Sequence, residues 1–102
     1  MFTATELIDE LNLDDTPETE QLFKGLIDDN VALIMDTLGP NVSLETVQND
    51  LMFQRCIKNM VTEMYYDRTL KQGFSSGTQI LMNHLIFKYS LKGSASGGQE
   101  SK

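Results

Sequence analysis

Residues 51–70, LMFQRCIKNMVTEMYYDRTL, are the stretch that decides the fold. The apolar side chains in it recur at alternating steps of three and four, which places them on one stripe of an α-helix. The stripe consists of Phe53, Cys56, Ile57, Met60, Val61, Met64 and Tyr65. The opposite face carries Gln54, Arg55, Lys58, Asn59, Glu63 and Arg68, which can remain in water. The pattern predicts an amphipathic helix over 51–70 whose apolar stripe forms the core.

A second apolar stripe of similar length lies in residues 17–38. Thr16 followed by Pro17 is a helix start signal, because proline tolerates the first helical position, and Gly39-Pro40 is a stop signal. The stripe consists of Leu22, Phe23, Leu26, Ile27, Val31, Ile34, Met35 and Leu38. Two stripes of this length predict two long helices that pack against each other.

Shorter elements are expected on either side of this pair. Thr3 and Glu6 fit a capping box in front of a short helix that reaches about Leu11. Another short helix is expected over 78–87, followed by an extended segment to residue 91. Its apolar face consists of Ile80, Leu81, His84 and Leu85.

The link over 39–49 allows two interpretations. Ser43 could cap an early helical turn through Leu44 and Val47, or the link could be a protruding loop. With this link, the chain is predicted to be all-α, a small bundle of two long antiparallel helices and two shorter ones. Residues 1–91 would form one helical domain, and 92–102, rich in glycine and serine, a disordered tail.

Charge is divided unevenly along the chain, whose net charge is −7. Residues 1–50 hold twelve acidic residues and one basic residue, for −11, whereas 51–102 hold three acidic and seven basic residues, for +4. The two halves can attract within one molecule or between copies, and the acidic surface can also serve only solubility. The candidate subunit-interface residues are Asp28, Asp29 and Asp36 on the acidic flank and Arg55, Lys58 and Arg68 on the basic flank.

The residues that could carry chemistry do not form a recognisable constellation. Cys56 lies on the core stripe, which predicts a buried and inert thiol. His84 has no second histidine or cysteine pair to join it, so a structural role is favoured. The acidic pairs at 14–15 and 28–29 lack the glycine and the final glutamate of a calcium loop. We therefore expect no enzymatic activity, no metal and no cofactor.

The run from Tyr65 to Arg68 resembles one in the small head-tail connector proteins of tailed bacteriophages, also called head-completion or portal-adaptor proteins. The resemblance covers about residues 3–91. It includes a short acidic first helix, the Asp14-Asp15 break, the segment EQLFKGLIDD at 20–29 and a last helix ending in Phe87-Lys88-Tyr89. The chain departs from the family at 74–77, FSSG, where a more proline-rich linker is usual.

The resemblance implies a structural virion protein without catalytic residues. Such proteins assemble in the host cytoplasm as a ring of about a dozen copies beneath the portal protein. The ring extends the channel, through which DNA passes as cargo, and it offers a docking platform for stopper or tail-completion proteins; no membrane is involved. The candidate portal-binding residues are Lys88, Tyr89, Leu91 and Lys92, on an arm that could order on binding. The alternative is a small acidic regulatory or DNA-mimic protein that binds a basic partner.

Overall fold

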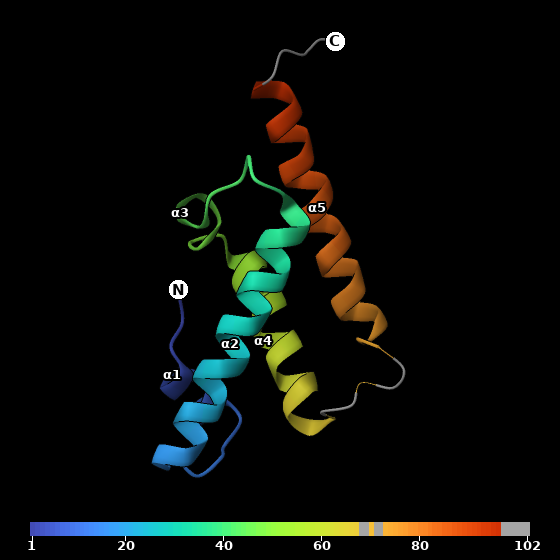
Figure 1. Ribbon diagram of the computed structural model, residues 1–102. Helices are drawn as coiled ribbons and strands as arrows, with labels where there is room; N and C mark the ends of the chain where they lie inside the picture. The colour runs from blue at the N-terminus through green and yellow to red at the C-terminus, as the bar shows by residue number, and fades with distance from the viewer. Residues whose placement is uncertain (68–69, 71–72, 97–102) are drawn as a thin grey trace.

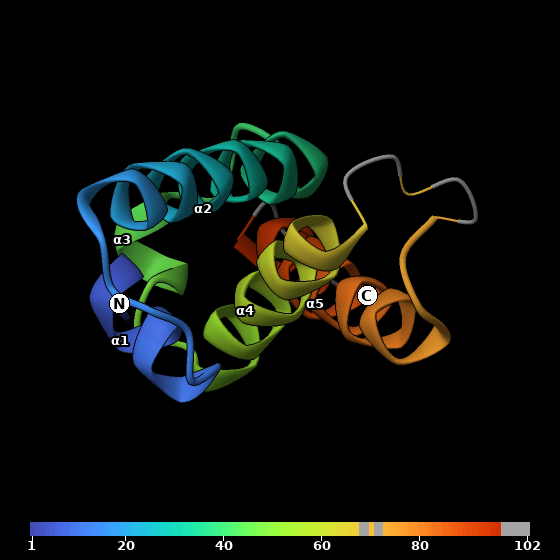
Figure 2. The same ribbon diagram turned by 90° about the horizontal axis from the view of Figure 1, so that it is seen from below.

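The computed structural model describes residues 1–67, 70 and 73–96, and of 91–96 it describes the backbone alone. The described residues form five helices: α1 (Ala4–Glu10), α2 (Pro17–Leu38), α3 (Leu44–Val47), α4 (Leu51–Tyr66) and α5 (Ser76–Ser96). The all-α class is confirmed. Helix α2 packs against α1 at one end and against α4 and α5 along the rest of its length (Figures 1 and 2).

The first two helices begin and end at the predicted signals. The Thr3 hydroxyl accepts a hydrogen bond from the Glu6 amide at 3.1 Å, and the Glu6 carboxylate accepts one from the Thr3 amide at 2.8 Å. The Thr16 hydroxyl likewise accepts from the Thr19 amide at 3.1 Å. Helix α2 stops before Gly39, whose φ of +95° is open to glycine at little cost. Local capping contacts therefore fix the residue at which each of the two helices begins.

The core lies mainly between α2 and α4. Phe23 of α2 and Phe53 of α4 are both fully buried. The other buried apolar residues of these two helices are Ile27, Ile34, Leu38, Cys56, Ile57, Met60 and Val61. The two predicted stripes thus pack against each other, but the expected pair of long antiparallel helices is not confirmed, since α2 and α4 cross obliquely (Figures 1 and 2).

Helix α4 ends at Tyr66, four residues before the predicted end. Asp67 leaves the helical conformation while its amide still donates to the Glu63 carbonyl at 2.8 Å. The apolar stripe ends at Tyr65, so a longer helix would bury no further residue of the stripe.

Helix α5 is longer than predicted and buries only part of the predicted face, since Leu85 is fully buried and Leu81 packs against the core. It continues to Ser96, so the end expected at Phe87 and the extended segment after it are wrong. Thr78, Leu85 and Tyr89 are buried, whereas Ile80 is 67% exposed and His84 is exposed. The rotation of the helix reflects the contacts of these buried residues with other helices, which sequence periodicity does not contain.

The link between α2 and α4 contains the short helix α3. Of the two interpretations of this link, the helical turn capped by Ser43 is therefore confirmed. The Ser43 hydroxyl accepts from the Thr46 amide at 3.2 Å, and Val47 is fully buried. Asp50 then caps α4 by accepting from the Met52 amide at 2.9 Å. Of the predicted tail, 92–96 belong to α5, and 97–102 lie outside the described residues.

Candidate functional site

The residues with catalytic potential are dispersed. Cys56 is fully buried, and burial together with the nearby Glu63 charge raises the pKa of its thiol to about 11, which keeps it protonated. Over residues 1–67 and 73–90, histidine, cysteine and carboxylate side chains form no group of three that could hold a metal ion. Nor does any helix in the described ranges have the length and apolar character needed to cross a membrane.

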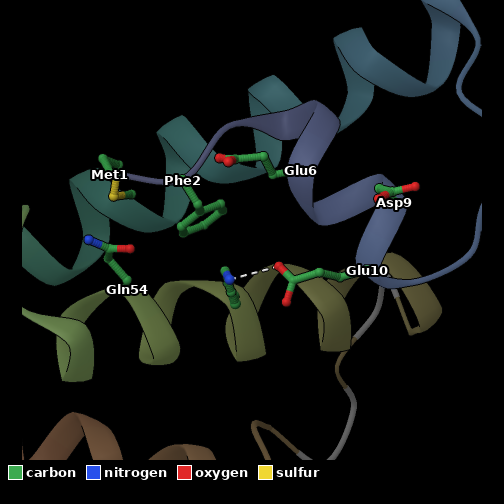
Figure 3. A pocket seen from close by; sticks show the side chains of 7 residues that line it. Met1, Phe2, Glu6, Asp9, Glu10 and Gln54 are labelled. Atoms are coloured by element: carbon green, nitrogen blue, oxygen red, sulfur yellow. Dashed lines mark hydrogen bonds and ion pairs between the residues drawn. The ribbon is translucent and has the colours of Figure 1, made fainter.

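A groove between α1 and α4 contains the first contact between the two charged halves (Figure 3). Lys58 donates to the Glu10 carboxylate at 2.7 Å, and its ammonium lies 5.2 Å from the centre of the Phe2 ring. The groove is lined by Met1, Phe2, Glu6, Asp9, Glu10, Gln54 and Lys58. Lys58, predicted at a subunit interface, is thus also used within the fold.

Asp50 forms the second contact between the halves. One of its carboxylate oxygens accepts from Lys88 at 2.8 Å and from the Tyr89 hydroxyl at 2.5 Å. Partial burial alone raises the pKa of Asp50, but the hydrogen bonds from Lys88, Tyr89 and the Met52 amide outweigh it and lower this pKa to about 2. Burial and the Asp50 carboxylate raise the pKa of Tyr89 to about 12. The carboxylate therefore ties the start of α4 to the middle of α5.

Two of the four candidate portal-binding residues are thus held against the bundle. Tyr89 is 3% exposed and Lys88 is half-buried. Leu91 and Lys92 follow on the same helical backbone. The segment is a helix fixed at one side, which differs from the extended arm expected from the sequence.

Glu63 joins the end of α4 to the start of α5, a contact that sequence reasoning missed. Its carboxylate accepts from the Ser75 amide at 2.6 Å, from the Ser75 hydroxyl at 2.9 Å and from the Thr78 hydroxyl. Ser75 in turn caps α5 by accepting from the Thr78 amide at 3.3 Å. Burial raises the pKa of Glu63, but these three hydrogen bonds outweigh it and lower the pKa. The sequence marks Ser75 as a turn residue and Glu63 as solvent-facing, and only the fold brings them together.

Replacing Glu63 by glutamine should reduce stability by about 1–2 kcal/mol at pH 7, because an amide cannot accept from all three donors. Since the folded pKa lies below the ordinary 4.5, the carboxylate stabilises the fold above pH 4.5 and loses this effect as the pH falls through the folded pKa. Urea unfolding between pH 3 and 7 tests this: the gap between wild type and Glu63→Gln should close on acidification. The exposed control Asp28→Asn should show no such gap; a constant gap for Glu63→Gln would contradict the assignment.

The acidic candidates lie on the solvent-facing side of α2. Asp28, Asp29 and Asp36 are exposed. Gly25 shares this side, and no atom lies within 4 Å of the position that a Cβ on it would occupy. Arg55 is exposed on α4, beside a second groove that α4 forms with α1. Among the described residues no ion pair joins the acidic trio to Arg55 or Lys58, and Arg68 lies outside these residues.

Helix α5 presents an apolar surface that the sequence did not indicate. Ile80 is 67% and Phe87 is 66% exposed, and their spacing of seven residues places them on the same side of the helix. The sequence pattern placed Ile80 on the core-facing side of the helix. The sequence lacked the information that fixes how the helix is rotated about its axis. This side of α5 faces away from α2 and α4.

No family model, no curated protein and no solved structure matches the chain. The resemblance to head-tail connector proteins stays a prediction from the residues quoted above.

Proposed function

We propose that the protein is a structural subunit, a head-tail connector that assembles as a ring beneath the portal of a tailed bacteriophage. The observation that carries the proposal is the presence of two unlike exposed surfaces on one small helical domain. One is the acidic side of α2 and the other is the apolar side of α5. A ring of identical subunits needs two unlike surfaces that fit each other. A protein that stays monomeric in water needs no such pair of surfaces.

The acidic surface also suits a DNA channel. Acidic residues of α2 that the subunit contact leaves uncovered would give the channel wall the same charge as the phosphate backbone, which would let a duplex slide without binding. The other face of such a ring would serve as the docking platform for a stopper or tail-completion protein.

Portal docking is proposed at the end of α5. Lys88 and Tyr89 can reach a partner only if their hydrogen bonds to Asp50 break, so the test uses the other two candidates, Leu91 and Lys92. In Figure 1 the last turns of α5 extend beyond the end of α2, as an anchoring element would.

The test is to mix the purified protein with particles of the portal protein encoded in the same genome, and to image the product by electron microscopy. Wild type should add a ring to one end of the portal. The double variant Leu91→Ser/Lys92→Glu should reduce ring occupancy at least about tenfold if each lost contact is worth about 1 kcal/mol. The exposed control Glu45→Gln should behave as wild type. Portal particles that stay bare with wild-type protein would overturn the proposal.

The exposed acidic residues of α2 also favour a second candidate, a regulatory protein that mimics DNA. Such a protein would bind a basic DNA-binding partner as a monomer or dimer and would leave portal particles bare. The imaging experiment separates the two functions, because only the connector adds a ring.

A further inference from the structure

We draw no further inference here: the strongest candidate, the exposed apolar side of α5 formed by Ile80 and Phe87, carries none because nothing in the structure shows what covers it.

Discussion

Replacing Phe53 by alanine should lower the free energy of unfolding by about 3–5 kcal/mol, the usual cost of removing a phenyl ring from a packed core. Phe53 is 0% exposed and lies in the first turn of α4, where that helix crosses the core. Domains of this size are commonly stable by about 5–15 kcal/mol, so the variant should unfold at much lower urea concentration or be partly unfolded without urea.

The matched control is Leu51→Ala in the same helix turn. Leu51 is 78% exposed, so its truncation should change stability by no more than about 0.5 kcal/mol. Urea unfolding monitored by circular dichroism, with the slope compared as well as the midpoint, separates lost packing from altered compactness. A loss below about 1 kcal/mol for Phe53→Ala would contradict the central role given to α4.

The part of the fold that could be predicted is the part with local causes. Thr16, Pro17 and Gly39 fix the bounds of α2 through contacts within a few residues, and the period of the α4 stripe identifies its buried side. Helix α5 lacks such causes. The spacing of its apolar residues does not show which side is buried, because apolar residues lie on both sides. One contact on the buried side is the hydrogen bond from the Tyr89 hydroxyl to Asp50, which lies 39 residues earlier.

The candidate site was predictable only in part for a related reason. The division of charge between the halves is visible in the sequence, but composition cannot tell an ion pair within the fold from one between copies. Lys58 with Glu10 and Lys88 with Asp50 both join a base of the second half to an acid of the first. The acidic trio on α2 and Arg55 form no ion pair within the described part of the chain, and their interface role stays a prediction.

Replacing Asp50 by alanine should cost about 2–4 kcal/mol, because one side chain performs two tasks. It caps α4 at the Met52 amide, and it is the acceptor for the hydroxyl of Tyr89, which is 3% exposed and has little access to water. Asp50→Asn keeps the cap and one acceptor oxygen, so its loss should be about half as large. Tyr89→Phe should also cost less than Asp50→Ala, since it removes the donor and leaves no buried hydroxyl.

The pH dependence of the stability difference between wild type and Asp50→Asn distinguishes the effect of the carboxylate charge from the effect of side-chain packing. The folded pKa of about 2 lies below the ordinary value of 3.8, so the carboxylate stabilises the fold fully above pH 3.8 and loses its effect as the pH falls through 2. The gap between wild type and Asp50→Asn should therefore narrow from pH 5 to pH 2. Hydrogen exchange supplies the local readout: amides around Tyr89 should exchange faster in Asp50→Asn than those of α2. Equal protection of α5 in both proteins would mean that burial of Leu85 and the Tyr89 ring holds the helix, and that Asp50 contributes only its cap.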